Sequence, residues 1–211
     1  MDIKLLNNIV IVRFLRLSNV DPLASNGHLG VYRTDDTTKQ LIEDFVLPIS
    51  RVQLEQDTAK SLRLTDSQSQ SDTDPLNTIL LDHNRSSIPL IEVVTPPVLR
   101  TPHHAATAFA KVAETLRAIG VTTADFHYGA MRCDVNVSLG LSFPRTEIKN
   151  LFGIRAVRLA CEHEIEKQVL QWRQNEPIRP LTKTWDGTQT VETREKHGEI
   201  DYRYFFQKEM C

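Results

Sequence analysis

The amino-acid sequence predicts an α+β fold in which a largely antiparallel sheet packs against two helices. Several short segments alternate apolar and polar residues with the period of a strand, and turn-forming residues separate them. Two longer segments instead repeat their apolar residues with helical spacing. Short turns between strands favour antiparallel pairing.

The first 17 residues have two interpretations. Residues 8–12 form an apolar run, which Lys4, Arg13 and Arg16 flank. This pattern fits an edge strand, or a targeting segment for an organelle that Asp2 would weaken. We expect the strand.

Several segments before residue 95 have strand character. A turn at Asn26-Gly27 precedes the first of them. The polar, aperiodic stretch 65–75 is expected to be a mobile loop. The expected strands of this half are 29–33, 46–56, 78–81 and 88–94.

Glu92 lies inside the apolar run 88–94, on the same face as Leu90 and Val94. Desolvation destabilises a carboxylate among apolar neighbours unless a cation, a metal or a hydrogen-bond donor compensates it. The alternative is a glutamate on an edge strand that points to water. The periodicity leaves both interpretations open.

Residues 101–120 predict the first helix. Thr101 is a good N-cap, Pro102 suits the first helical position, and Gly120 suits the position after the last turn. The apolar stripe of this helix consists of Ala105, Phe109, Val112, Leu116 and Ile119.

Residues 131–141 alternate most regularly, with an apolar residue at every odd position. After a turn at 140–144, residues 146–150 predict a partner strand. If the two strands pair, one face collects Arg132, Asp134, Asn136, Glu147 and Lys149. Carboxylates, amides and cations in one place are typical of a phosphate, metal or acyl-substrate site. An ordinary solvated sheet face with cross-strand ion pairs shows the same pattern.

Residues 152–174 predict the second helix, with Cys161 in its core-facing stripe. The stripe consists of Ile154, Val157, Cys161, Ile165, Val169 and Trp172. His163 lies off this stripe among glutamates, so we expect it to face solvent.

Two further segments follow the second helix. Residues 181–185 and 189–193 flank Asp186-Gly187, which is a strong signal for a two-residue hairpin turn. Residues 200–206 interleave aromatic side chains with charged ones. These rings fit a base-stacking surface, or a strand that packs them onto the helices.

Composition excludes several classes of protein. The 211 residues are 40% hydrophobic, enough for one domain with an appendage. The net charge of -2 gives no global basic field, so any contact with nucleic acid requires a local patch. The three cysteines are widely spaced, which favours a reducing compartment over a disulfide framework or a zinc site. No apolar run approaches the length of a membrane span.

Five blocks in the sequence, in their order, resemble one family. They are Asp-His-Asn-Arg at 82–85, Pro-Leu-Ile-Glu-Val-Val at 89–94, Arg-Cys-Asp-Val-Asn-Val-Ser at 132–138, Glu-Ile-Lys-Asn-Leu at 147–151 and Asp-Tyr-Arg-Tyr-Phe at 201–205. Residues 21–27 and 54–60 extend the match, which covers about residues 18–206. Together they closely resemble the B subunit of the glutamyl/aspartyl-tRNA amidotransferase, the GatB/GatE family.

The resemblance implies a catalytic cradle domain similar to glutamine synthetase. It implies the use of ATP and Mg²⁺ to phosphorylate the side-chain carboxylate of the glutamate in misacylated Glu-tRNA(Gln). A glutaminase-type A subunit would provide the ammonia that displaces the phosphate, and a small accessory subunit would complete the complex. The loop 65–75 is an insertion relative to compact bacterial members, which suggests a mitochondrial version in the matrix.

The resemblance also implies which residues form the site. Glu92 matches a metal ligand of the family, and the other residues match blocks that face the site, without individual roles. The expected catalytic residues are Glu55, Asp134, Glu147 and Lys149. The expected cofactor-binding residues are Arg132, Asn136 and Asn150.

The sequence departs from the family pattern in four places. His127 and Tyr128 stand where the family usually has two acidic residues ahead of the Arg-Cys-Asp block. The family begins with a strand bearing a Leu-Glu-Val-His motif that supplies groups to the metal site, and residues 1–17 do not match it. Gln56 stands where the family has the second of two glutamates. The domains that grip the tRNA would follow residue 206.

We therefore expect the middle of a B subunit. Its parts are an unmatched segment 1–17, a partial cradle domain 18–206 and a tail 207–211 without the C-terminal tRNA-binding domains. Two hypotheses remain open at this point. One is a working component of a carbon–nitrogen ligase, and the other is a non-catalytic remnant or incomplete gene product that only binds a partner subunit or RNA.

Overall fold

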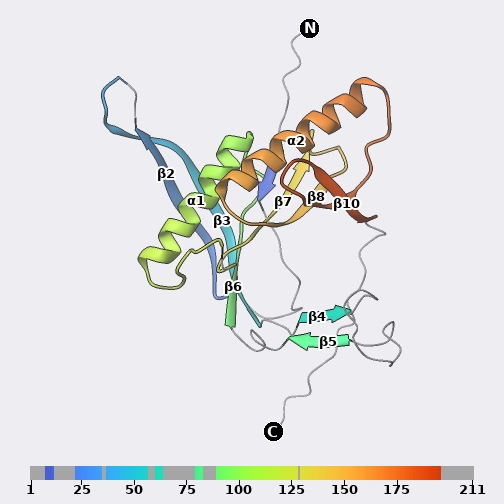
Figure 1. The fold of residues 1–211 in the computed structure, drawn as a ribbon. Coiled ribbons are helices and arrows are strands. Elements are labelled where there is room, and N and C mark those ends of the chain that lie inside the picture. Colours follow the sequence, from blue (N-terminus) through green and yellow to red (C-terminus); the bar gives the residue numbers. More distant parts are fainter. Residues whose placement is uncertain are drawn as a thin grey trace.

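The computed structural model describes residues 8–11, 22–34, 37–56, 60–63, 79–82, 89–127 and 129–195 (Figure 1). The strands are β1 Asn8–Ile11, β2 Ala24–Thr34, β3 Leu41–Gln56, β4 Lys60–Arg63, β5 Ile79–Asp82, β6 Pro89–Val94, β7 Cys133–Ser138, β8 Thr146–Leu151, β9 Leu181–Trp185 and β10 Thr190–Glu195. The helices are α1 Pro102–Ala118 and α2 Ile154–Arg173. The predicted α+β class is confirmed.

The largest sheet has five strands in the order β1-β7-β8-β9-β10. Its neighbours are antiparallel except β8 and β9, which run parallel. This exception follows from the connection between them: α2 returns the chain to the starting end of the sheet, as a parallel pair requires. The predicted β9–β10 hairpin is confirmed, but the two-residue turn is wrong: residues 186–189 separate the paired Trp185 and Thr190, and the Asp186 N–H donates to the Gln189 carbonyl at 3.1 Å.

A second sheet has three strands in the order β2-β3-β6, and β4 pairs with β5 separately. The long β2–β3 hairpin extends away from the rest of the molecule (Figure 1). The predicted turn at Asn26-Gly27 is wrong, because both residues lie inside β2 and its pairing continues on either side of them. Asn26 has a φ of 58°, a left-handed conformation that asparagine tolerates within an extended segment.

Helix α1 follows its sequence signals. The Thr101 side chain accepts a hydrogen bond from the backbone N–H of His104 at 3.1 Å, and Pro102 begins the helix. The C-terminal end of the predicted stripe is wrong, because Ile119 is the C-cap and is 67% exposed. Ala105 and Phe109 of the stripe are buried as predicted, and Ala106, Ala108 and Ala113 complete a buried face of mostly small residues, which lets the helix lie close to its neighbours.

The predicted stripe of helix α2 is confirmed at its centre, where Val157 and Cys161 are buried, and is wrong at its two ends. Cys161 is buried as expected, but Ile154 and Trp172 are exposed. Glu164 and Gln168 are fully buried. They lie seven and eleven residues after the buried Val157, so helical periodicity places all three on one face.

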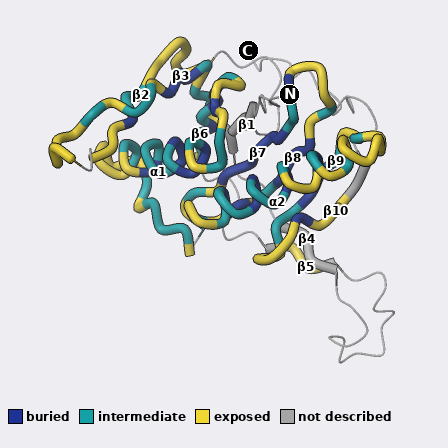
Figure 2. Tube along the Cα trace, turned by 90° about the horizontal axis from the view of Figure 1, so that it is seen from above, coloured by how far each residue is buried: buried dark blue, intermediate teal, exposed yellow. Residues whose placement is uncertain are grey.

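One hydrophobic core joins both large sheets and both helices. Figure 2 shows β7 as a largely buried stretch near the centre of the molecule. The members of the core with the least exposure are Val31, Leu47, Leu99, Ala105, Ala108, Val135, Val137, Ile148, Leu151, Val157, Ala160 and Cys161. Because residues from β2, β3, α1, β7, β8 and α2 pack together, the described elements position one another.

The N-terminal edge of the five-stranded sheet is occupied by β1. Asn8–Ile11 pairs with Val135–Ser138 of β7 in an antiparallel register. The strand interpretation of this apolar run is therefore confirmed for residues 8–11, while the rest of segment 1–17 lies outside the described residues.

The strand expected at 131–141 is shorter in the structure. β7 ends at Ser138, and Leu141 is 84% exposed in the following loop. The Ser138 hydroxyl lies 2.6 Å from the Gly140 carbonyl and 3.0 Å from the Phe143 carbonyl. These contacts satisfy loop carbonyls locally and so compete with continued strand pairing.

Several expectations concern segments outside the described residues, namely the loop 65–75 and the aromatic segment 200–206. Among the described residues, neither helix is long and apolar enough to cross a membrane.

Candidate functional site

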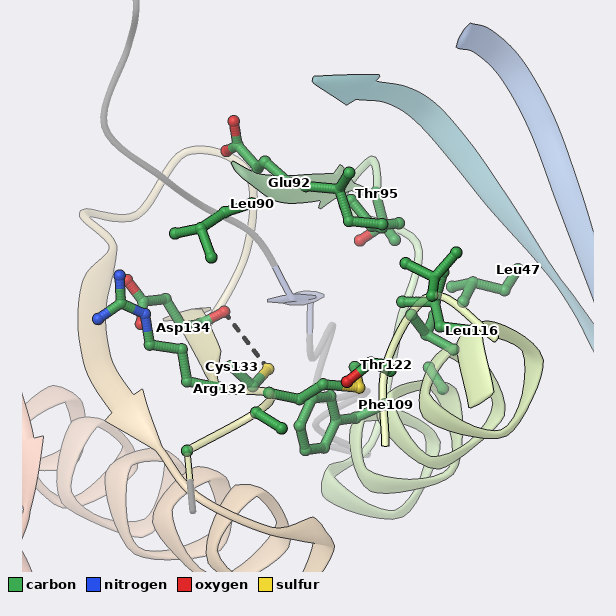
Figure 3. A pocket seen from close by; sticks show the side chains of 18 of the residues that line it. Leu47, Leu90, Glu92, Thr95, Phe109, Leu116, Thr122, Arg132, Cys133 and Asp134 are labelled. Carbon is green, nitrogen blue, oxygen red and sulfur yellow. Dashed lines mark hydrogen bonds between the residues drawn. The ribbon is translucent and has the colours of Figure 1, made fainter. Parts of the chain in front are cut away.

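A cavity of about 240 Å³ lies between β6, α1 and β7 (Figure 3). Its walls are mostly apolar, with Leu47 and Leu116 on one side. Arg132 and Asp134 lie on the opposite side, and Glu92 comes from β6 above them in this view. A pocket of this kind, apolar with a few convergent polar groups, is typical of a small-molecule site.

Glu92 is buried, with 4% of its surface exposed. It lies on β6, which is the last strand of the three-stranded sheet, yet it lines the cavity. The alternative that it points to water is therefore wrong. Burial of a carboxylate here has an energetic cost that a bound cation would offset.

Asp134 is held by the backbone of the neighbouring strand. The N–H of Asn150 donates to Asp134 Oδ1 at 2.9 Å, across an irregularity in the β7–β8 register between Cys133 and Val135. Asn150 has a φ of 57°, so it adopts a left-handed conformation at the end of β8. The predicted site residues Asp134 and Asn150 are thus in direct contact.

Burial raises the pKa of Asp134 above that of an exposed aspartate. The Asn150 N–H and the nearby Lys149 act in the opposite direction, because both stabilise the ionised carboxylate. The burial effect dominates. A raised pKa beside a cavity is a recognised indication of a functional site.

The β7–β8 hairpin brings together the other predicted residues. Asn136 pairs with Glu147 in register, and both side chains are buried, with 5% and 4% exposure. Lys149 Nζ lies 3.8 Å from Glu147 Oε1, longer than a hydrogen bond. The interpretation of this face as an ordinary solvated one is wrong, because Asp134, Asn136 and Glu147 are all buried.

The predicted residues fall into two adjoining groups. Glu92, Arg132 and Asp134 line the cavity, whereas Asn136, Glu147, Lys149 and Asn150 lie beside Asp134 on the hairpin without lining it. The backbone of Glu55 in β3 pairs with Leu90, two residues before Glu92, and its side chain lies outside the described part.

Sequence reasoning missed a buried polar network under α2. Glu164 receives hydrogen bonds from Lys183 Nζ at 3.0 and 2.9 Å to its two oxygens, from Thr190 Oγ1 at 2.8 Å and from Gln168 Nε2 at 3.2 Å. Gln168 Nε2 also reaches Thr146 Oγ1 at 3.1 Å. Glu164 and Lys183 are 0% and 3% exposed. The network ties α2 to β8, β9 and β10.

The signal that predicts this network is the helical spacing of Glu164 and Gln168 relative to Val157. Charged and amide residues are normally assigned to a solvated face, which conceals that signal. His163 was also expected in solvent, but its Nδ1 lies 3.1 Å from Thr190 Oγ1 and its ring contacts Trp185 edge-on. That expectation is wrong because the β9–β10 hairpin covers this side of α2.

The described residues supply only some of the ligands that a metal ion needs. Within the described residues, no group of three or more His, Cys, Asp or Glu side chains is arranged to hold a metal ion. The cavity supplies two carboxylates, Glu92 and Asp134. The assignment of Glu92 as a metal ligand therefore stays a prediction.

Comparison with known proteins gives a consistent result. The GatB/GatE catalytic domain matches residues 14–211. The B subunit of the mitochondrial glutamyl-tRNA(Gln) amidotransferase of Clavispora lusitaniae is 38% identical over 187 residues, which cover 87% of this chain and 33% of that protein. The corresponding protein of Yarrowia lipolytica is 39% identical over 188 residues, covering 89% of this chain and 32% of the relative.

A bacterial relative agrees with these fungal ones. The B subunit of the aspartyl/glutamyl-tRNA(Asn/Gln) amidotransferase of Coprothermobacter proteolyticus is 42% identical over 164 residues, which cover 75% of this chain and 34% of the relative. The chain spans about a third of the length of the curated relatives it matches. From the family match and these identities, the chain belongs to the GatB/GatE family, whose catalytic domain occupies almost all of it.

Proposed function

We propose that this chain acts within a tRNA-dependent amidotransferase as part of its B subunit. The reaction converts misacylated Glu-tRNA(Gln) to Gln-tRNA(Gln), through ATP-dependent activation of the glutamyl carboxylate and amidation with glutamine-derived ammonia. The observation that carries this proposal is the cavity that Glu92, Arg132 and Asp134 line, next to the buried polar hairpin. Relatives named as amidotransferase B subunits support it.

The donor set of the cavity fits magnesium bound together with ATP. Mg²⁺ commonly uses one or two protein carboxylates and completes its shell with waters and phosphate oxygens. Glu92 and Asp134 would be those carboxylates. When bound, Mg²⁺ and ATP supply the phosphoryl group and neutralise the charge that develops on it.

The cationic residues would orient the oxyanions. Arg132 lines the cavity and is exposed, so its guanidinium is accessible to a phosphate group, which it can bind with two hydrogen bonds. Lys149 would serve the same purpose from the hairpin, where its side chain is 30% exposed. Asn136 and Asn150 would complete cofactor binding. Glu55 would act at the reacting carboxylate, and Glu147 would hold the rest of the aminoacyl group beside it.

The proposed assembly follows from the names of the relatives. Each name denotes one component of a multisubunit enzyme, and we propose a glutaminase-type A subunit and a small accessory subunit as partners. The mitochondrial relatives favour the mitochondrial matrix as the location. We propose further that the described sheets form part of a cradle similar to glutamine synthetase.

The test is amidation of Glu-tRNA(Gln) by the chain assembled with its partner subunits, ATP and glutamine. Glu92→Gln keeps the size of the side chain and removes its charge, so we expect amidation to fall by about a hundredfold. Glu114→Gln is the matched control, since Glu114 is on α1 with its side chain 70% exposed, and it should keep full activity. Full activity of Glu92→Gln would contradict the role of Glu92, and no amidation by the wild-type assembly would contradict the proposed function.

A further inference from the structure

A transverse row of polar residues crosses the five-stranded sheet beyond the predicted site. In register, Asn136 of β7 pairs with Glu147 of β8, which pairs with Thr182 of β9. All three side chains are buried, with exposures of 5%, 4% and 3%. Thr182 lies outside the sequence blocks that identified the family, so neither motif nor spacing assigned it to the site.

Contacts on the opposite face establish the orientation of this row. Thr146 and Lys183 are the sequence neighbours of Glu147 and Thr182, and both bond to residues of α2. Successive side chains of a strand point to opposite faces. Glu147 and Thr182 therefore lie together on the face that α2 does not cover.

The hydroxyl of Thr182 is a buried polar group without a hydrogen-bond partner among the described residues. Its own carbonyl is satisfied, because Thr193 Oγ1 donates to it at 2.8 Å. A buried hydroxyl that makes no hydrogen bond lowers stability, and such groups are rare in folded proteins. A ligand that bonds to this hydroxyl would remove that cost.

The neighbours of Thr182 determine the charge of such a ligand. The adjacent Glu147 is a buried carboxylate, which repels an oxyanion and attracts a cation. The ammonium group of Lys149 lies 3.8 Å from Glu147 Oε1, so this carboxylate already lies beside one cation. A primary ammonium would donate to the Glu147 carboxylate and to Thr182 Oγ1 together.

We propose that Glu147 and Thr182 form a binding site for the α-ammonium group of an aminoacyl ester. This proposal rests on the proposed function, because the glutamyl ester of a misacylated tRNA carries such an ammonium beside the carboxylate that reacts. Thr182 is then a positioning residue: it holds the aminoacyl group and does not take part in bond changes.

Binding of two small esters to the full chain tests the site without requiring catalysis. L-glutamate α-methyl ester has the free ammonium, and its N-acetyl derivative has neither the charge nor the three donors. By NMR titration we expect the wild type to bind the free-amine ester at least about tenfold more tightly. Thr182→Val should abolish this preference, and Thr182→Ser, which keeps the hydroxyl, should retain it.

Thr146→Val is the matched control for folding. Thr146 is a buried threonine of the adjacent strand on the opposite face, and its hydroxyl accepts a hydrogen bond from Gln168. This variant should keep the ester preference but unfold at a lower denaturant concentration. Thr182→Val should be as stable as the wild type or more stable, because it replaces an unsatisfied buried hydroxyl with a methyl group.

The outcomes separate this inference from the proposed function. Equal binding of both esters, binding of neither, or a preference that survives Thr182→Val would overturn the ammonium site. If the assembled wild type still amidates Glu-tRNA(Gln) in that case, the proposed function stands alone. An ammonium preference that depends on Thr182, without any amidation, would support the site and contradict the function.

Discussion

The Glu164–Lys183 ion pair is a buried contact that joins α2 to the β9–β10 hairpin. Lys183→Met removes the cation and leaves the Glu164 carboxylate buried, so we expect the free energy of unfolding to fall by about 3–5 kcal/mol. Urea denaturation followed by circular dichroism measures this change. Replacing both partners with apolar residues should restore part of the loss, because no charge then remains buried.

An exposed ion pair of the same helix serves as the control. Arg158 Nη1 lies 2.6 Å from Glu162 Oε1, one turn along α2, and both side chains are well exposed. Arg158→Met should change the free energy of unfolding by no more than about 0.5 kcal/mol, because solvent screens such pairs. Similar losses for Lys183→Met and Arg158→Met would contradict the assignment of the stabilising contact to the buried pair.

Asp134 is expected to lower stability at neutral pH. Its folded-state pKa is raised by burial, so the folded protein binds a proton more readily than the unfolded chain. The free energy of unfolding attributable to Asp134 therefore rises as the pH falls through the folded-state pKa towards the ordinary value of about 3.9. At a pH above the folded-state pKa the buried Asp134 carboxylate is ionised, and the free energy of unfolding is lowered by the full amount.

The variant Asp134→Asn removes this cost and retains the oxygen that accepts from the Asn150 N–H. It should be more stable than the wild type at pH 7, and the difference should shrink as the pH approaches about 4. Denaturation at the two pH values measures it. A difference independent of pH would show that packing, and not the carboxylate charge, is responsible. Amidation should decrease, since the carboxylate lines the proposed site.

At the scale of the elements, the N-terminus of α1 depends on one side chain. Thr101→Ala removes the acceptor of the His104 N–H, so we expect a loss of about 1 kcal/mol in the free energy of unfolding. Thr107→Ala is the comparison, because its hydroxyl bonds only to the His103 carbonyl inside the same helix. Alanine favours a helix interior, so this change should be neutral or stabilising, and a loss equal to that of Thr101→Ala would contradict the capping role.

Elements that depend on local chemistry were predicted from the sequence. Thr101, Pro102 and Gly120 marked α1, and Asp186-Gly187 marked the β9–β10 turn. Asn26-Gly27 has equally good turn chemistry but lies within β2, because the residues on both sides of Asn26 pair with β3. The parallel pairing of β8 and β9 has no local signal either, since it follows from the path of α2 across the sheet.

At the scale of the whole molecule, the sequence did not predict which polar side chains are buried. The residue types of the candidate site were identified, but alternation predicted a solvated face for Asp134, Asn136 and Glu147. Asp134 is buried beside a cavity that it shares with β6, a strand about 40 residues earlier in the sequence. Thr182 lies next to Glu147 because β8 and β9 pair in this register, and the sequence has no local signal for that pairing. The sequence alone therefore does not predict a function for the Thr182 hydroxyl.

The single core of the molecule also protects its two described cysteines. Cys133 on β7 and Cys161 on α2 belong to the same hydrophobic cluster, with exposures of 4% and 0%. Burial raises the pKa of both thiols, so the reactive thiolate is scarce as well as inaccessible. Both should therefore react with a thiol reagent only when the core opens.

The measurement uses a Cys211→Ser chain, so that only the two buried thiols remain. Reaction with a bulky aromatic disulfide should be roughly a thousandfold or more slower in buffer than in urea, the factor expected when global unfolding is required. Cys133 lines the cavity and Cys161 does not, so mass spectrometry of each site provides an internal control. Equal protection of the two would show that the cavity opens only with the core. Faster modification of Cys133 would contradict this, and would mean that β6 and α1 separate from β7 while α2 stays packed.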